Sequence, residues 1–222
     1  MVDEIRSSNA RPVRSVIYLI LFALAAAITL ASVDRATSER IAANELAERL
    51  NALKELLQFD EYNNEPHLDA ITVLHPDLLG SEEPLPVYRA RINLEPVAAV
   101  LTAVTPDGFS GEIRIFIAIY PDGEVAAVRV IEHHESPGLG DLIEHRKSDW
   151  IEAFTGLQTS EVVADLRAPA WTLDRDDGDF DHISGATVTS RAVVKAVRNA
   201  ALYFNAHRAE IFAPPVETVE SQ

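Results

Sequence analysis

The stretch Glu112-Ile-Arg-Ile-Phe-Ile-Ala-Ile-Tyr120, followed by Pro121-Asp-Gly123 and Val125-Ala-Ala-Val-Arg-Val-Ile-Glu132, decides the fold of this chain. Its first arm places four isoleucines on one face, the period-two pattern of a half-buried strand: Ile113, Ile115, Ile117 and Ile119. Pro-Asp-Gly supplies a tight turn, so the two arms form a β-hairpin. An antiparallel sheet is therefore the centre of the predicted fold.

Further strands and helices are predicted on both sides of this hairpin. Strand-like segments lie at 87–92 and 97–104, and residues 60–86, rich in Pro, Asn, Asp and Glu, are predicted to be loop with short elements. Asp141 followed by Glu144 is typical of a capping box, which predicts a helix over 141–154. A final amphipathic helix is predicted over 189–206. The fold class is therefore α+β, an antiparallel sheet with flanking helices.

An uncharged apolar run marks the N-terminal part of the chain. Residues 15–33 contain no charged side chain, and as a helix they would extend about 28 Å, close to the hydrocarbon thickness of a bilayer. A secretory signal peptide is the competing interpretation, but its apolar core usually ends at about 15 residues, so we favour an uncleaved single-pass anchor. Arg6, Arg11 and Arg14 precede the run, which predicts a cytoplasmic N-terminus and a C-terminal domain outside the cytoplasmic membrane.

A second helix is predicted after the span, capped by Thr37 or Ser38 and ending near Leu57. Its apolar residues form one stripe: Ile41, Leu46, Leu50, Leu53 and Leu57. Such a stripe usually packs on its own domain, and the alternative is a stalk that contacts a partner. The predicted layout is a cytoplasmic N-terminus (1–14), a transmembrane helix (15–33), a helical stalk and loop region (34–86), an α+β domain (87–213) and a disordered tail (214–222).

The composition excludes several classes of function. The net charge of −16 makes a basic groove for nucleic acid implausible, and it argues against adhesion of the domain to anionic lipid. The chain has no cysteine, which excludes disulfides, cysteine-ligated iron–sulfur clusters and a thiol nucleophile. Any redox chemistry must therefore come from an organic cofactor.

The string Asp181-His-Ile-Ser184-Gly185-Ala186-Thr187 stands directly before the final helix. Gly185 permits a sharp turn, Ala186 is small, and Thr189 or Ser190 can cap the helix. A phosphate on Thr187 would lie where unpaired N–H groups and the helix dipole favour an anion, without requiring any lysine. Taken alone, the string also fits an ordinary capped helix after a Ser-Gly turn, because short motifs often match by chance.

Three blocks of sequence together resemble the G subunit of the Rnf (Rsx) electron-transport complex, a relative of the C subunit of sodium-translocating NADH:quinone reductase. The first block is Pro106-Asp-Gly-Phe-Ser-Gly-Glu-Ile113. The second is Glu135-Ser-Pro-Gly-Leu-Gly-Asp141, with Ser148-Asp-Trp-Ile151 and Phe154-x-Gly156. The third runs from Asp176 through Asp181 and Thr187 to Val197. The likeness covers essentially the whole chain, although residues 60–86 carry little of it.

The resemblance implies that residues 87–213 form an FMN-binding domain and that Thr187 carries FMN through a phosphoester. A separate, magnesium-dependent flavin transferase would install it from FAD, and Asp181 would serve recognition by that enzyme or the local turn. The absence of a visible base beside Thr187 agrees with this need for help. The chain would then be an electron-carrying subunit of an ion-translocating oxidoreductase in the bacterial inner membrane, with a periplasmic domain, the other Rnf subunits as partners and no substrate turnover of its own.

The same resemblance assigns the loop Pro137-Gly-Leu-Gly140 to the flavin pocket. Glycines let the backbone approach a flat ring and Leu139 could pack on the isoalloxazine, although a tight loop before the next helix also explains both glycines. Besides Thr187, the expected cofactor site contains Ser184, Gly185, Ala186, Thr189, Ser190, Gly138, Leu139 and Gly140. No catalytic residue and no metal site are expected, since the aspartates of 174–181 lack the ligand order of an EF-hand and are interpreted as a solvated acidic loop.

Two other functions stay open from the sequence. The chain could be the C-type subunit of a sodium-translocating NADH:quinone reductase, which is a weaker match in length and in the block from Asp176 to Asp181. It could also be an unflavinylated, membrane-anchored binding or scaffold module whose Ser-Gly-Ala-Thr turn is only structural.

Overall fold

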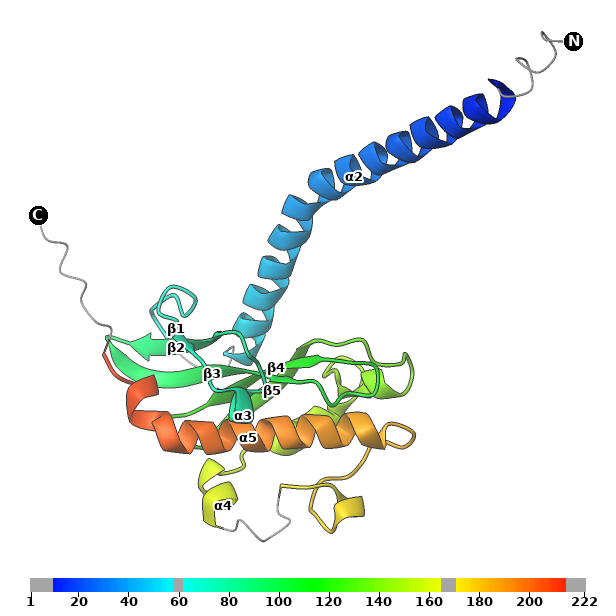
Figure 1. Cartoon of the computed structure of the whole chain (residues 1–222). Coiled ribbons are helices and arrows are strands. Elements are labelled where there is room, and N and C mark those ends of the chain that lie inside the picture. Colours follow the sequence, from blue (N-terminus) through cyan, green and yellow to red (C-terminus); the bar gives the residue numbers. More distant parts are fainter. Residues whose placement is uncertain (1–9, 58–61, 165–170, 215–222) are drawn as a thin grey trace, which may run out of the picture. The chain divides into compact units, whose positions relative to one another are not determined.

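The computed structural model describes residues 10–57, 62–164 and 171–214 (Figure 1). The chain divides into two units, Met1–Glu48 and Arg49–Gln222, which are described separately. The helix α2 (Ala10–Leu56) forms the described part of the first unit and continues into the second. Within α2, Ser15–Thr37 is long and apolar enough to cross a membrane. Its mean hydropathy is 2.6, and its most apolar residues are not buried against the rest of the protein.

The helix α2 is continuous where the sequence predicted a break. The prediction that Thr37 or Ser38 caps a new helix is wrong. The Thr37 hydroxyl donates to the Val33 carbonyl oxygen at 2.9 Å, which is a bond made inside a helix rather than at its start. The candidate span runs to Thr37, beyond the predicted end at Val33, and its last residues include the charged Asp34 and Arg35. The side chains of Ile41 and Leu46, residues 1–9 and the tail after residue 214 lie outside the described structure.

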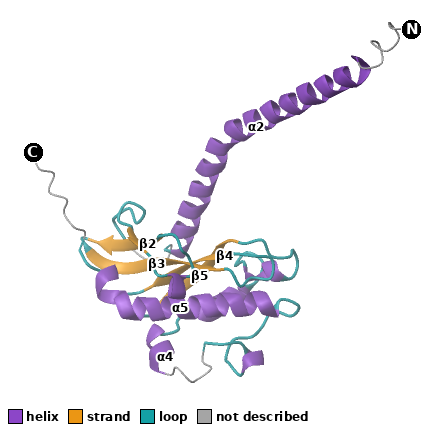
Figure 2. Ribbon diagram, viewed as in Figure 1, coloured by secondary structure: helices purple, strands orange, loops and turns teal. Residues whose placement is uncertain are grey.

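A five-stranded antiparallel meander is the centre of the second unit (Figure 2). Its strands are β1 (Ile71–Val73), β2 (Leu85–Ile92), β3 (Glu95–Thr105), β4 (Ile113–Ile119) and β5 (Val125–Glu132), each paired with the next. In the register of the central strands, Ile117 lies opposite Leu101 on β3 and Val128 on β5. The predicted strands, the hairpin and the α+β fold class are confirmed.

Both faces of the sheet are buried, which corrects the prediction of a half-buried hairpin. The isoleucine face of β4 joins the main core with residues of α5 (Thr187–Ile211) such as Val197 and Phe204. The other face forms a second core, in which Phe116 and Ala118 pack with Leu53, Leu56 and Leu57. Because the end of α2 covers this face, β4 is an almost continuous apolar run. The last residues of the predicted stripe therefore pack on their own sheet.

The segment after β5 contains no long helix, so the predicted helix over 141–154 is wrong. Two 3-10 helices occupy it, η1 (Gly140–Ile143) and η2 (Asp149–Phe154). Asp141 does not cap a helix, because its carboxylate accepts hydrogen bonds from the Gly138 N–H at 2.7 Å and from Lys147 at 2.8 Å. Ser148 caps η2 instead, accepting from the Trp150 N–H at 3.1 Å.

Short helices complete the second unit: α3 (Pro76–Leu79), α4 (Thr159–Ala164) and η3 (Asp174–Asp176). The range 34–86, predicted as stalk and loop, contributes α3, β1 and the first residues of β2. The domain boundaries themselves stay a prediction. In the views of Figures 1 and 2, α5 runs along one face of the sheet, in agreement with the core that the two share.

Two buried arginines share one carboxylate at the β1–β2 side of the sheet. Arg89 and Arg91 are only 5% and 2% exposed. Both guanidinium groups bond to the Asp69 carboxylate, Arg91 Nε at 2.7 Å, and both donate to the Ala213 carbonyl oxygen, at 3.0 and 2.8 Å. This charge cluster therefore ties the chain after α5 to the sheet.

We expect Asp69→Ala to lower the free energy of unfolding by about 3 kcal/mol or more, because it leaves two buried guanidinium groups without their shared carboxylate. Urea unfolding of the detergent-solubilised protein, followed by tryptophan fluorescence, measures the loss. Glu112→Ala is the matched control: its carboxylate is exposed and pairs with Arg114 at 2.9 Å, so the loss should stay below about 1 kcal/mol. Equal losses for the two variants would contradict this account of the cluster.

Candidate functional site

A cavity of about 490 Å³ opens beside the N-terminal end of α5. Its volume lies within the range of about 300–1,000 Å³ that is typical of small-molecule sites. The wall comes from four segments that are distant in sequence: the loop after β3, the loop after β5, η3 and the start of α5. The lining residues are Phe109, Glu135, Ser136, Leu139, Gly140, Arg175, Gly185, Ala186, Thr187, Val188 and Thr189.

Three exposed apolar side chains line this cavity. Phe109, Leu139 and Val188 are 70%, 48% and 47% exposed and come from three different segments. Gly185 has a positive φ of 83°, and a Cβ atom there would lie 3.0 Å from the Leu139 side chain, so glycine permits this close approach. Apolar groups that gather around a cavity indicate a ligand or partner surface.

A buried carboxylate, Glu135, joins three walls of the cavity. Its side chain accepts a hydrogen bond from the Thr189 hydroxyl of α5 at 2.7 Å and another from the Ser110 N–H at 3.0 Å. Glu135 is 5% exposed and packs on Gly140, where a Cβ atom would come within 2.8 Å of Glu135 Oε2. The glycine at 140, predicted to let the backbone approach a ring, is therefore required by Glu135.

The helix α5 begins without a side-chain cap. It starts at Thr187, two residues earlier than predicted, and its N-cap residue is Ala186. Neither Thr189 nor Ser190 caps it: Thr189 bonds to Glu135, while Ser190 accepts from the Ile183 N–H at 3.1 Å and donates to the Ala186 carbonyl at 3.0 Å. The first-turn N–H groups of α5 consequently keep their capacity to bind an anion beside Thr187.

Aromatic packing supports the turn that leads into α5. The Trp150 indole N–H donates to the Asp181 carbonyl oxygen at 2.6 Å. Trp150 packs edge-on against Phe154, whose ring lies 4.5 Å from that of Phe180. The backbone at Asp181 is thus held by this aromatic cluster, whereas the residue itself is exposed.

The acidic segment before this turn is held by basic partners rather than being fully solvated. Asp176 accepts two hydrogen bonds from Arg191 at 2.6 and 2.9 Å, and Asp174 bonds to His182 at 2.9 Å. These hydrogen bonds lower the pKa of Asp176 and of Asp174 below the usual value, so both carboxylates stay charged. Arg175 donates from Nε to His182 Nε2 at 3.0 Å.

Hydrogen bonds to charged side chains also hold the loop that carries Leu139. Its Gly138, with a φ of 79°, donates its N–H to Asp141, and the hydrogen bond from Lys147 lowers the pKa of the Asp141 carboxyl. His133 accepts from the Glu135 N–H at 3.0 Å and contacts Glu144 at 2.9 Å. A charged, hydrogen-bonded network therefore fixes this wall of the cavity.

Most of the predicted site residues meet at the cavity. Six line it: Thr187, Gly185, Ala186, Thr189, Leu139 and Gly140. Ser184, Ser190 and Gly138 do not line it, and Ser190 instead closes the turn before α5. Five lining residues escaped the sequence prediction: Phe109, Glu135, Ser136, Arg175 and Val188. All of them except Arg175 stand in the blocks that carried the family resemblance, which was the signal available for them.

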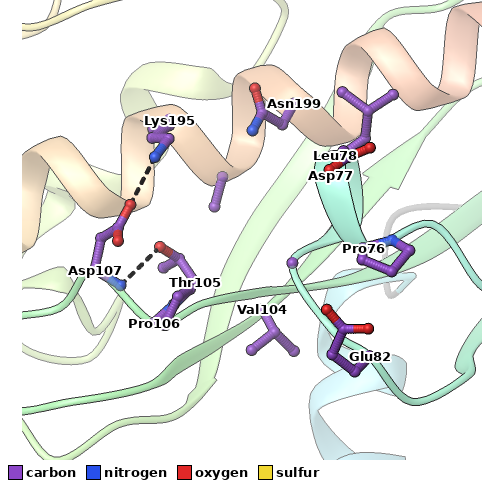
Figure 3. Close-up of a pocket in the computed structure, with 12 residues that line it drawn as sticks. Pro76, Asp77, Leu78, Glu82, Val104, Thr105, Pro106, Asp107, Lys195 and Asn199 are labelled. Atoms are coloured by element: carbon purple, nitrogen blue, oxygen red, sulfur yellow. Dashed lines mark hydrogen bonds and ion pairs between the residues drawn. The ribbon is translucent and has the colours of Figure 1, made fainter.

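A second cavity of about 310 Å³ lies farther along α5, between α3 and the end of β3 (Figure 3). Figure 3 shows Lys195 of α5 reaching Asp107, which it meets at 2.7 Å. This ion pair links α5 to the loop after β3, the loop that contributes Phe109 to the first cavity. Among the described residues, no group of three or more His, Cys, Asp or Glu side chains is arranged to hold a metal ion.

Comparison with known proteins identifies the family. A model of FMN-binding domains matches residues 108–202, and a model of the RnfG N-terminal region matches residues 12–56. The G subunit of the ion-translocating oxidoreductase complex of Shewanella oneidensis is 38% identical over 208 residues, covering 94% of this chain and 96% of the relative. The chain belongs to the family of these G subunits. The corresponding protein of Pseudomonas aeruginosa PAO1 is 40% identical, covering 90% of this chain and 92% of that protein.

The match to the G subunits confirms the resemblance drawn from the three blocks and extends over both units. A more distant likeness, with 15% identity and a TM-score of 0.42, is to the crystal structure of the C subunit of the Na(+)-translocating NADH-quinone reductase from Parabacteroides distasonis. It covers 69% of this chain and 73% of that chain. In this member of the G-subunit family, the cavity lies within the region that matches FMN-binding domains.

Thr189→Val should lower the free energy of unfolding by about 1–2 kcal/mol, because it leaves the buried Glu135 carboxylate without the Thr189 hydroxyl donor. Thr187→Val makes the same chemical change two residues earlier, at a half-buried position whose hydroxyl has no bond to any described residue, and should cost less than about 0.5 kcal/mol. Urea unfolding of unflavinylated protein compares the two. A larger loss for Thr187→Val would contradict the assigned role of Glu135.

Proposed function

We propose that this protein carries electrons through an FMN that is covalently attached to Thr187, within a membrane-bound, ion-translocating oxidoreductase complex of the Rnf type. The observation that carries the proposal is the position of Thr187. It is the first residue of α5, lies beside uncapped N–H groups and lines a cavity with exposed apolar side chains, in a region that matches FMN-binding domains.

The residues present fit FMN at both ends of the molecule. The helix start offers hydrogen-bond donors and a positive dipole to a phosphate at Thr187. Phe109, Leu139 and Val188 offer apolar contact to a flat ring system. The isoalloxazine supplies the electron-transfer chemistry when bound, and the protein supplies the tether, the orientation and the electrostatics.

The attachment requires an enzyme. In the proposed reaction the Thr187 Oγ forms a bond to the FMN phosphorus of FAD, the phosphoanhydride bond breaks, AMP leaves and the hydroxyl proton is released. No described side chain bonds to the Thr187 hydroxyl as a base, and the nearby Glu135 carboxylate already accepts from Thr189 and Ser110. A magnesium-dependent flavin transferase would supply that base, and the exposed Asp181, held through its backbone by Trp150, would be a recognition element.

The N-terminal helix supports the proposed membrane arrangement. Ser15–Thr37 would cross the bacterial inner membrane once, with Arg11 and Arg14 on the cytoplasmic side and the FMN domain in the periplasm. A covalent tether suits that compartment, because a dissociable flavin would be lost where free FMN is scarce. The partners are the other subunits of the complex, and no substrate turnover by this protein alone is proposed.

Co-production with the flavin transferase should yield a protein band that fluoresces under ultraviolet light on a denaturing gel. Thr187→Val should abolish this fluorescence and remove one FMN group from the intact mass, because the acceptor oxygen is gone. Thr189→Val is the matched control: its hydroxyl is bonded to Glu135, so the band should stay fluorescent. A dark wild-type band would refute covalent attachment and favour an unflavinylated binding or scaffold module.

A reporter that is active only in the periplasm should be active when fused after residue 40, because the predicted span ends before this point. A reporter that is active only in the cytoplasm should be inactive at the same position. The opposite pair of results would refute the proposed orientation without affecting the assignment of Thr187.

A further inference from the structure

We propose that Arg175 is the cation that holds the phosphodiester on Thr187 and that His182 and Asp174 fix Arg175 for this task. The inference rests on the proposed attachment of FMN to Thr187 and adds a phosphate-binding residue to it. Among the described residues that line the cavity, Arg175 is the one basic side chain. It comes from η3, a segment that precedes the acceptor turn and bonds to it through His182.

The bonds around Arg175 orient its side chain. Because an arginine Nε–H can only donate, His182 Nε2 must be the acceptor of their 3.0 Å bond, which places the imidazole proton on Nδ1. That Nδ1–H donates to the Asp174 carboxylate, whose two oxygens lie at 2.9 and 3.0 Å. Asp174 also accepts from the backbone N–H of Arg175 at 2.8 Å. Both ends of the arginine residue are therefore held by one hydrogen-bonded chain.

The guanidinium group keeps donors for a ligand. Its Nε–H is used on His182, while the four N–H donors on Nη1 and Nη2 make no hydrogen bond or ion pair with another described residue. The neighbouring Arg191 differs, because its Nε and Nη2 both donate to Asp176, at 2.6 and 2.9 Å. A phosphodiester presents two non-bridging oxygens that match such a free planar fork.

The carboxylates near the cavity already have hydrogen-bond partners other than Arg175 side-chain donors, so they leave those donors available to a ligand. Asp174 and Asp176, the carboxylates flanking Arg175 in η3, are bonded to His182 and Arg191 respectively. Glu135, which also lines the cavity, is bonded to Ser110 and Thr189. Arg175 and the uncapped start of α5 thus both offer N–H donors to an anion at the cavity that Thr187 lines.

The test is flavin transfer to full-length, detergent-solubilised protein by purified transferase with FAD and Mg²⁺, followed by intact mass and in-gel fluorescence. Arg175→Gln should slow the transfer about tenfold, the effect of losing one charge-assisted contact to phosphate. Arg208→Gln removes the same charge from the last turn of α5, outside the cavity lining, so it should transfer at the wild-type rate. Arg175→Lys, which keeps the charge and loses the fork, should be intermediate.

The loaded protein provides a second readout that does not depend on activity. The ³¹P resonance of the phosphodiester should shift in Arg175→Gln relative to wild type and should stay in place in Arg208→Gln. His182→Phe, which removes the acceptor, should reproduce part of the Arg175→Gln shift, and His182→Gln, which restores an acceptor oxygen, should reduce it. Urea unfolding of the unloaded variants checks that the fold is retained.

The outcomes separate this inference from the function on which it rests. A wild-type protein that accepts no flavin refutes the attachment to Thr187. If the wild type is flavinylated and Arg175→Gln matches it in both transfer rate and ³¹P resonance, the role of Arg175 is refuted. The attachment of FMN to Thr187 then still stands. If Arg175→Gln leaves the ³¹P resonance unchanged but alters the reduction potential of the flavin, Arg175 contacts the isoalloxazine ring instead. This result would also overturn its assignment to the phosphate.

Discussion

The hydrogen bonds of Glu135 are the constraint on which the candidate site depends. A buried carboxylate is costly unless its oxygens are bonded, and Glu135 finds its donors on two other segments, Ser110 in the loop after β3 and Thr189 in α5. Gly108 and Gly140 leave the space that its side chain fills. Three walls of the cavity are consequently placed by one carboxylate, and the walls that carry Ser110 and Thr189 cannot shift without breaking one of its hydrogen bonds.

The same constraint separates two threonines that look alike in the sequence. Successive helix residues are about 100° apart, so Thr187 and Thr189 point in nearly opposite directions. Both line the cavity, but Thr189 is buried and gives its hydroxyl to Glu135, whereas the Thr187 hydroxyl has no bond to any described residue. Because Thr189 and Ser190 are both bonded elsewhere, neither caps α5. The inward bonds thus leave both a hydroxyl and a set of unused N–H donors on the cavity side, the arrangement that a phosphoester would need.

The features that could be predicted from the sequence are those set by local pattern or by a linear motif. The isoleucine alternation predicted β4, the Pro-Asp-Gly turn predicted the hairpin, and the string ending at Thr187 marked the start of α5 to within two residues. The helix over 141–154 failed because Asp141 and Glu144, which match a capping box, bond instead to Gly138, Lys147 and His133. The hairpin was expected to be only half-buried because the sequence does not show that α2 ends against Phe116 on the other face of the sheet.

Arg175 illustrates the limit of reading a charge pattern along the chain. In the sequence it is one basic residue within an aspartate-rich segment, and the segment as a whole indicates a solvated, acidic surface. In the fold, Asp174 and Asp176 are bonded to His182 and Arg191, which lie 8 and 15 residues farther along the chain. The donors available to a ligand are therefore set by which groups are already bonded, and Arg175 keeps unused donors although the loop as a whole is acidic. A chain of net charge −16 can in this way keep free guanidinium donors at the cavity that Thr187 lines.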